Sequence, residues 1–405
     1  MAHQPITSHH AGIHGGLLSR GMVAVLIAQF ISALADNALL FAAIALLKTQ
    51  FAPAWQIPLL QEFFVVAFII LAPFVGPFAD ALPKGRVMLI ANGLKFIGAA
   101  AMLSGLHPLL AYGMVGIGAA AYSPAKYGIL SELVSAEKLV QANSMIEGST
   151  IVAILLGAVL GGMLADHSAT GALTAIAGCY LLAAAANLLI PRLKPMHPLV
   201  KFAVMPLLKD FIHALKTLFS NQDARFSLVG TSVFWGAGST LRFLLVAWVP
   251  VALNIHDLST PANLSGAVAI GIAFGAFAAA KYVNLGNVNR ALPAGILIGL
   301  LIMAFAYVTN LYVAIAILIV IGACGGFYVV PLNALLQERG HESVGAGHAI
   351  AIQNLVENFL MLLMIGFYTL LDKQGSPVVA STVAVGALVF LAISTLAWTR
   401  LRSGK

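Results

Sequence analysis

Residues 21–47 read GMVAVLIAQFISALADNALLFAAIALL, an apolar run that one charged residue, Asp36, interrupts. A helix needs about 20 apolar residues to cross the hydrocarbon core of a bilayer. The run is longer than a signal-peptide core and no cleavage signature follows it, so we expect it to remain in the mature protein. It predicts a membrane-spanning helix that carries a carboxylate near its middle.

The composition of the whole chain is that of a membrane protein. Of its 405 residues, 60% are hydrophobic and 9% are charged, whereas soluble domains contain about 25% charged residues. This balance excludes a water-soluble globule. The net charge of +7 comes from basic residues that do not cluster with aromatic residues, so we expect no nucleic-acid partner.

Hydropathy predicts an all-α membrane protein with twelve transmembrane helices, whose ends are marked by Gly, Pro and charged residues. They lie near 20–47, 57–81, 86–105, 108–132, 138–165, 169–190, 225–253, 262–284, 288–308, 310–337, 343–371 and 377–399. The predicted segments are a disordered N-terminal tail (1–19), a six-helix bundle (20–190), a cytoplasmic linker (191–224) and a second six-helix bundle (225–401). Apolar residues on one face of the linker predict an amphipathic helix that lies along the membrane surface.

Basic residues are distributed asymmetrically over the predicted loops. With the N-terminus inside, only Lys48 and Lys373 among the loop lysines and arginines fall on the outer side. Because cytoplasmic loops carry an excess of Lys and Arg, we expect both termini to be cytoplasmic.

The two halves of the chain resemble each other. Residues 118–126 (GAAAYSPAK) align with 325–333 (GGFYVVPLN), at an offset of 207 (331 minus 124). Ala142-Asn143 aligns with Gly347-His348 at an offset of 205 (348 minus 143). Similar offsets in different spans predict a duplicated unit, with two pseudo-symmetric bundles and a binding site near the midplane between them.

The loop between the second and third spans, residues 76–86, reads GPFADALPKGR. It resembles the signature of that loop in the major facilitator superfamily, and the resemblance implies this fold and a gating role for Asp80, Lys84 and Arg86. A carboxylate at a helix end can pair with loop cations and hold one face of a transporter closed. Ala81 stands where a basic residue is usual, so a plain positively charged loop is the alternative.

Charged and amide side chains occur inside the predicted spans, and eight of them form the candidate binding site: Asp36, Asn37, Lys126, Glu147, Arg242, Gln353, Glu357 and Asn358. A charge at the bilayer centre costs roughly 2.5 to 17 kcal/mol, so these residues should face a shared cavity. Asp36 and Arg242 are 206 residues apart (242 minus 36), close to the repeat offset, and we expect them to meet there. Lys95 is expected to extend its long side chain to the membrane surface, and the alternative is that it lines the cytoplasmic end of the cavity with Asn92.

Charges of both signs suit a headgroup that carries a phosphate and an amine. Arg242 can bind phosphate through its guanidinium fork, Lys126 can add a point charge, and Asp36 and Glu357 can receive an ammonium. Two alternatives remain open: an ion network that only holds the halves together, and a proton-coupling carboxylate at Asp36 or Glu357. The sequence has no phosphate-binding Gly-rich loop and no Cys/His metal cluster, so we expect no enzyme, cofactor or metal site.

Longer strings resemble the lysophospholipid transporters of Gram-negative inner membranes: 28–41 (AQFISALADNALLF), 118–130 (GAAAYSPAKYGIL), 226–238 (FSLVGTSVFWGAG), 241–245 (LRFLL) and 330–339 (VPLNALLQER). The resemblance covers residues 18–402 and implies a flippase that works by facilitated alternating access, with lipids entering sideways. The implied substrates are lysophosphatidylethanolamine, lysophosphatidylglycerol and lysocardiolipin, moved from the periplasmic to the cytoplasmic leaflet. The implied functional partner is a cytoplasmic-side acyltransferase/acyl-carrier-protein synthetase. Two alternative functions remain open: a proton-coupled exporter of drugs or metabolites, suggested by Asp36 and Glu357, and a non-transporting membrane scaffold, suggested by the incomplete gating loop.

Overall fold

The computed structural model describes residues 16–134, 139–191, 193, 204–283, 285–344 and 346–403. Within these ranges the regular elements are all helices. Most of the expected N-terminal tail and part of the expected linker, residues 1–15 and 194–203, lie outside them.

The first half of the chain forms seven helices: α1 (Arg20–Thr49), α2 (Gln56–Ala81), α3 (Lys84–Leu103), α4 (Pro108–Gly128), α5 (Leu130–Leu133), α6 (Leu139–His167) and α7 (Ala169–Leu188). α8 (Val204–Ser220) occupies the linker. The second half forms α9 (Gln222–Leu253), α10 (Ser259–Tyr282), the 3-10 segment η2 (Leu285–Ala291), α11 (Leu292–Phe305), α12 (Leu311–Ser343), α13 (Ala346–Lys373) and α14 (Val378–Ser403).

Capping side chains mark where several of these helices begin. The Ser168 hydroxyl accepts from the Gly171 amide at the start of α7, and the Asn221 side chain accepts from the Ala224 amide at the start of α9. Short polar residues at this position satisfy amides that have no partner within the helix. The loops between spans can therefore be short without leaving helix ends unsatisfied.

Eleven of the described helices are long and apolar enough to cross a membrane, one fewer than the sequence predicts. The helix outside this set is α4, whose sequence is rich in Gly, Ala, Tyr and Pro. α4 packs between α2 and α3 and buries most of its residues in protein. A helix that neighbours shield from lipid can be less apolar, which explains why it does not stand out by hydropathy.

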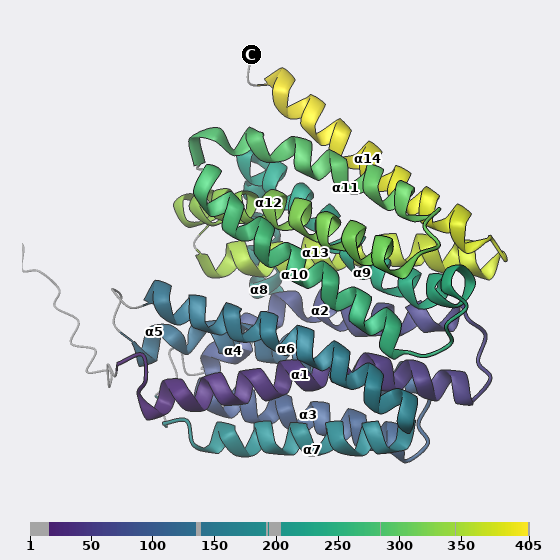
Figure 1. Cartoon of the computed structure of the whole chain (residues 1–405). Coiled ribbons are helices and arrows are strands. Elements are labelled where there is room, and N and C mark those ends of the chain that lie inside the picture. The colour runs from purple at the N-terminus through teal and green to yellow at the C-terminus, as the bar shows by residue number, and fades with distance from the viewer. Residues whose placement is uncertain are drawn as a thin grey trace, which may run out of the picture.

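The helices form two groups, seen in Figure 1 as a lower purple-to-teal half and an upper green-to-yellow half. In the first group α1 packs against α6 and α7, and α3 packs against α4 and α7. In the second, α12 packs against α10 and α9, and α14 packs against α11. The most extensive contacts between the groups are those of α2 with α13 and of α6 with α10, and α2 also contacts α9. We call the end where α1 begins and α14 ends the terminal end, and the opposite end the loop end.

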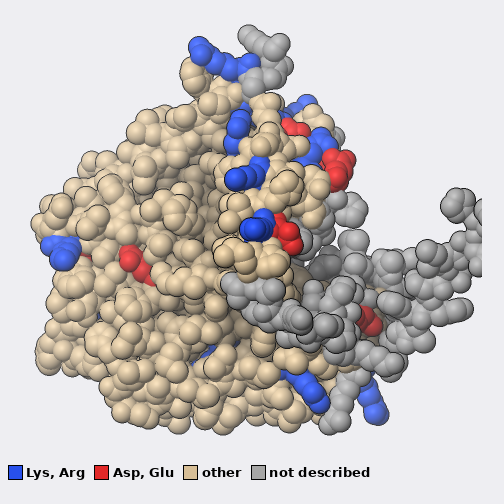
Figure 2. Space-filling view, turned by 180° about the vertical axis from the view of Figure 1, so that it is seen from behind, with Lys and Arg blue, Asp and Glu red and all other residues tan. Residues whose placement is uncertain are grey.

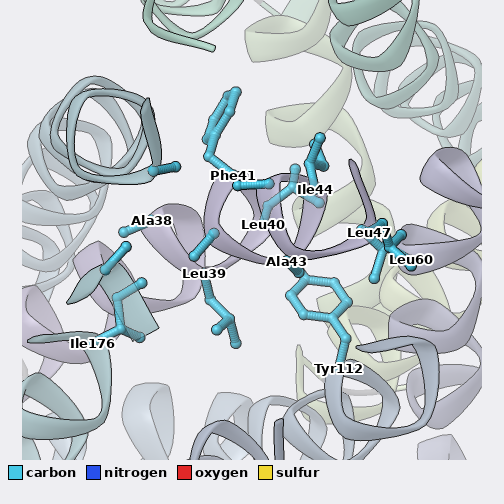
Figure 3. Packing of buried hydrophobic residues seen from close by; sticks show 14 of the residues in the cluster. Ala38, Leu39, Leu40, Phe41, Ala43, Ile44, Leu47, Leu60, Tyr112 and Ile176 are labelled. Carbon is cyan, nitrogen blue, oxygen red and sulfur yellow. The ribbon is translucent and has the colours of Figure 1, made fainter. Parts of the chain in front are cut away.

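The middle of α1 lies at the centre of the largest apolar cluster (Figure 3). Leu39, Leu40 and Phe41 are completely buried. α6 approaches α1 closely because it has glycine at the contact: a Cβ at Gly161 would lie 2.5 Å from the Ala38 Cα. Small residues at such contacts allow tight helix packing in membranes, where packing rather than water exclusion favours association.

The outer surface is apolar around the middle and charged mainly at one end. Phe274, Phe277 and Ile70 are among the large apolar residues that face outward. Figure 2 shows lysines and arginines gathered toward the end where the chain terminates, beside a broad band with few charges. An apolar belt of this kind needs lipid around it. The protein is therefore a multi-pass membrane protein.

α8 differs in placement from the predicted amphipathic helix. Its apolar side chains Phe211, Ala214 and Leu218 are buried, and they pack with residues of α2, α9, α12 and α13. Only part of the apolar face, such as Ile212, remains exposed. The predicted helix is present, but protein covers most of the face that was expected to contact lipid.

Candidate functional site

Asp36, in the middle of α1, is held by residues of its own helix group. Its Oδ2 lies 2.6 Å from the Lys95 Nζ on α3, and its Oδ1 accepts a hydrogen bond of 2.8 Å from the Tyr180 hydroxyl on α7. Lys95 also donates to the Ser32 Oγ at 3.0 Å, and Ser32 donates to the Asn92 Oδ1 at 2.7 Å. Both oxygens of the carboxylate are therefore occupied.

This arrangement corrects the expectation for Lys95. Instead of reaching the membrane surface, Lys95 is 1% exposed, and its ammonium lies 4.9 Å from the ring centre of Tyr122 on α4. Gly118 on α4 leaves room for it, since a Cβ there would lie 2.8 Å from the Lys95 Cγ. A lysine can remain buried when a carboxylate compensates its charge.

The sequence did contain a signal for this network. Ser32 and Asp36 are four residues apart, and Asn92 and Lys95 are three apart, so each pair shares one face of its helix. Two polar helix faces inside apolar spans are expected either to pack against each other or to line a cavity. The spacing alone does not say which helices carry the two faces toward one another.

Arg242, on α9, does not form the expected ion pair with Asp36. Among the ion pairs between described residues, Asp36 pairs with Lys95, and Arg242 is in none of them. The Tyr112 hydroxyl on α4 nevertheless interacts electrostatically with both Arg242 and Asp36. The two pseudo-equivalent residues thus approach the same tyrosine from opposite halves without pairing.

Arg242 also lines an apolar cavity of about 180 Å³. The cavity lies mainly among α9, α10, α11 and α12, and Ile154 of α6 contributes from the first half. Its polar lining is limited to Arg242, Ser239 and Ser265, whereas the remaining lining residues are apolar or glycine. A permanent cation therefore lies beside a hollow that favours hydrocarbon.

A second polar network surrounds Glu357 on α13, which is 8% exposed. The Gln353 amide donates to the Glu357 Oε1 and to the Asn333 Oδ1, each at 2.8 Å. The Thr231 side chain of α9 lies near Glu357, while its hydroxyl donates to the Leu228 carbonyl of its own helix at 3.3 Å. The hydrogen bonds of Gln353 connect α12 and α13, and Asn333 stands at the repeat position of Lys126.

The two asparagines that follow the acidic residues bond to their own helices. The Asn37 amide donates to the Ala33 carbonyl at 2.9 Å, and the Asn358 amide donates to the Asn354 carbonyl at 2.7 Å. In each case the partner lies one turn earlier. The side-chain oxygens of Asn37 and Asn358 accept no hydrogen bond from the described residues, so they can accept one from a ligand.

Lys126 lies nearer the terminal end than the sequence suggested. α4 ends at Gly128, so Lys126 is in its last turn rather than in mid-span. It is one helical turn, about 6 Å, beyond Tyr122, and its ammonium lies 4.2 Å from the Tyr127 ring centre. The Glu147 side chain lies outside the described residues. Lys126 is therefore displaced toward the terminal end, and Asp36 and Arg242 form no ion pair with each other.

The predicted gating residues are spread over the terminal end. Lys84 is buried and its Nζ lies 2.6 Å from the Glu132 Oε1, within the first half. Arg86 is exposed, and the Asp80 side chain lies outside the described residues. The structure thus pairs one loop cation with a partner that the sequence had not suggested.

The family follows from comparison with known proteins. The sequence profile of the Major Facilitator Superfamily matches residues 25–365, which is most of the chain. The chain belongs to this superfamily. Its relatives are named as transporters, in agreement with the expectation of a transporter rather than an enzyme.

Curated relatives of this superfamily member include the lysophospholipid transporter LplT of Shigella boydii serotype 4 (strain Sb227) and that of Escherichia coli O7:K1 (strain IAI39 / ExPEC). Each is 57% identical over 385 residues, which cover 95% of this chain and 97% of the relative. The nucleoside transporter NupG (D323A mutant) has a similar structure, with a TM-score of 0.73 at 13% identity over 95% of this chain and 99% of that one. A bacterial homologue of the human lysosomal transporter Spinster has a TM-score of 0.69 at 15% identity, over 95% and 97% of the two chains. The identity to LplT is far higher than that to either solved structure.

In this major facilitator protein the two halves are joined at the loop end. Asp166 at the end of α6 accepts hydrogen bonds from the Leu258 amide at 2.6 Å, from the Ser259 amide at 2.8 Å and from the Ser259 hydroxyl. The negative carboxylate thus binds the start of α10, where the helix dipole is positive. α6 and α10 belong to different halves, so this contact holds them together.

Further contacts close the same end. The Thr369 hydroxyl of α13 donates to the Glu62 Oε1 of α2 at 3.2 Å, and the Lys373 ammonium lies 5.0 Å from the Trp55 ring centre. The large apolar cluster around α1 also includes α9 and α10 residues such as Phe243 and Ala262. At the terminal end, the cluster around the start of α1 contains residues that precede α8, whereas the α8 cluster joins Ala72 of α2 to residues of the second half. Among the described residues, the hydrogen bonds between the halves therefore lie at the loop end, and the packing at the terminal end is apolar.

Proposed function

We propose that this protein transports lysophospholipids across a membrane. The observation that carries the proposal is the position of Arg242, a guanidinium that lines an otherwise apolar cavity of about 180 Å³. A lysophospholipid has one phosphate-bearing head and one hydrocarbon chain, so its two parts match the two parts of this site. The 57% identity to proteins named lysophospholipid transporter supports the same substrate class.

In this proposal Arg242 binds the lipid phosphate through its guanidinium fork. Asp36 and Glu357, with the neighbouring Asn37, Asn358 and Gln353, contact the rest of the headgroup. Lys126 and Glu147 act nearer the terminal end, where the headgroup leaves the site. The substrates are lysophosphatidylethanolamine, lysophosphatidylglycerol and lysocardiolipin.

The proposed topology has twelve spans, with α4 as the one that hydropathy does not identify, in the inner membrane of a Gram-negative bacterium. Both termini are cytoplasmic, because lysines and arginines gather at the terminal end. Lipids move from the periplasmic to the cytoplasmic leaflet and enter sideways between the two halves. A cytoplasmic-side acyltransferase/acyl-carrier-protein synthetase then reacylates them.

Alternating access requires the loop-end contacts to break in part of the cycle. The Asp166 contact with Ser259 is proposed to open when the outer side admits a lipid. Asp80, Lys84 and Arg86 are proposed to control the terminal end in the opposite step. No ion coupling is needed for such facilitated movement.

Transport can be tested with the purified protein in proteoliposomes that contain a fluorescent lysophosphatidylethanolamine. We expect Arg242→Ala to reduce leaflet transfer by roughly 10- to 150-fold, because loss of a charged hydrogen-bonding partner costs about 1.5 to 3 kcal/mol and the apolar site offers no substitute. Arg242→Lys should restore part of the rate. Arg402→Ala is the control, because the Arg402 guanidinium stacks on the exposed Trp398 ring. This variant should transfer the lipid at the wild-type rate. Wild-type rates in Arg242→Ala would refute the phosphate role.

The alternative is a proton-coupled exporter of drugs or metabolites, and the burial of Glu357 favours it. A carboxylate that is 8% exposed and lies between helices is a suitable place for a transported proton. The same proteoliposomes discriminate the two functions. Lysolipid transfer that continues without a proton gradient supports the first function, whereas absence of lysolipid transfer together with gradient-driven movement of a drug supports the second.

A further inference from the structure

Lys95 is a buried cation that has no assigned role in the proposed function, and it lies directly behind a residue that has one. In the Lys95–Asp36 pair, 2% of the lysine side chain and 21% of the aspartate side chain are exposed. Asp36 is therefore the accessible member of the pair, and Lys95 is almost completely enclosed by protein. A ligand can touch Asp36, whereas Lys95 offers it almost no surface.

The partners of Lys95 all come from the first half. Besides Asp36, its ammonium contacts the Ser32 hydroxyl and the faces of Tyr122 and Tyr180, at 4.9 and 5.9 Å from the ring centres. Tyr180 also donates to the other oxygen of Asp36. The carboxylate is thus fixed in orientation by two donors from behind, and its charge is compensated by one of them.

Because Lys95 compensates its charge, Asp36 presents a weaker electric field to a lipid headgroup. A carboxylate and an ammonium 2.6 Å apart form a neutral pair, whose field falls off with distance faster than that of a single charge. A bare carboxylate in a site of low dielectric would attract an ammonium and repel an anionic headgroup by several kcal/mol at short range. The neutral pair attracts an ammonium only weakly and repels an anionic headgroup only weakly.

We propose that Lys95 is a positioning residue that sets the headgroup specificity of the site. By neutralising Asp36 from behind, it allows one site to accept both zwitterionic and anionic lysophospholipid headgroups. The inference rests on the proposed lysophospholipid transport and names the determinant of its charge tolerance. Its consequence is that removal of either member of the pair changes specificity, and that the two removals act in opposite directions.

The test measures transfer of lysophosphatidylethanolamine and lysophosphatidylglycerol separately in proteoliposomes and reports the ratio of their kcat/KM values. In Lys95→Met the bare carboxylate should raise the zwitterionic-to-anionic ratio roughly tenfold, mainly through KM. In Asp36→Asn the uncompensated lysine should lower the ratio by a similar factor. The double variant is neutral again, so its ratio should return to near the wild-type value even if its absolute rate is low. Lys95→Arg keeps the charge and should keep the ratio.

Lys84→Met is the matched control. Lys84 is equally buried, and it forms an ion pair of the same 2.6 Å length with Glu132, but at the terminal end of the same helix group. A general loss of stability from an unpaired buried carboxylate would affect both lysine variants alike, whereas the headgroup ratio should change only in Lys95→Met. If Lys95→Met does not fold, the ratio measured for Asp36→Asn alone tests the inference.

An unchanged ratio in Asp36→Asn, or shifts of both single variants in the same direction, would overturn the inference while leaving lysolipid transport intact. Failure of the wild-type protein to transfer either lipid would instead overturn the proposed function, and the inference with it. The two failures are therefore distinguishable in one data set.

Discussion

At the scale of single residues, the site depends on small side chains as much as on charged ones. Lys95 can stay buried beside Asp36 because Gly118 on the neighbouring helix has no side chain. A Cβ at Gly118 would lie 2.6 Å from the Ala91 carbonyl oxygen and 2.8 Å from the Lys95 Cγ. The glycine therefore fixes both the distance between α3 and α4 and the path of the lysine side chain.

We predict that Gly118→Ala destabilises the protein and disturbs the Asp36 network. Since the added methyl meets backbone, overpacking should cost about 1 to 3 kcal/mol, visible as a lower Tm in detergent. Gly93→Ala is the matched control, because it is also in a helix of this half but its Cβ would meet nothing within 4 Å. It should be as stable as the wild type or more so, because alanine favours helix. Equal effects of the two substitutions would contradict this account.

At the scale of helices, hydropathy predicts where spans begin and end far better than it predicts what they contact. The predicted span at 86–105 is observed as Lys84–Leu103, and that at 377–399 as Val378–Ser403. The partner of Lys95 and the docking of α8 could not be predicted in this way. Both depend on how helices are rotated and placed against one another, which periodicity within one helix does not determine.

α8 offers a test at this scale, because the structure buries a face that an interfacial helix would give to lipid. Leu218 is completely buried, whereas Ile212, on the same helix, is 40% exposed. Leu218→Ala should therefore cost about 2 to 5 kcal/mol of stability, and Ile212→Ala less than about 0.5 kcal/mol. Unfolding of the two variants in detergent can be compared directly. If α8 instead lay free on the membrane, both substitutions would be nearly neutral.

At the scale of the whole molecule, the described residues make few hydrogen bonds between the two halves, and these lie at the loop end. Asp166 makes the largest number of these hydrogen bonds, because its carboxylate accepts from two backbone amides and a hydroxyl. It is also exposed to solvent, so its contribution is small compared with that of a buried pair. A weak contact of this kind suits a transporter, because a strong one would hold the protein in one state.

We therefore predict that Asp166→Ala shifts the population toward molecules that are open at the loop end. Loss of about 1 to 2 kcal/mol corresponds to a 5- to 30-fold change in the equilibrium. The shift can be followed by the rate at which a maleimide labels a cysteine at Ala262, which is completely buried where α6 meets α10, in a background with Cys179 and Cys324 replaced by serine. Asp257→Ala is the control, since Asp257 caps the same helix through the Thr260 amide at 2.8 Å but belongs to the same half. Faster labelling in Asp166→Ala alone would mean that the bond between the halves, rather than the helix cap, keeps this end closed; equal labelling in both variants would rule that out.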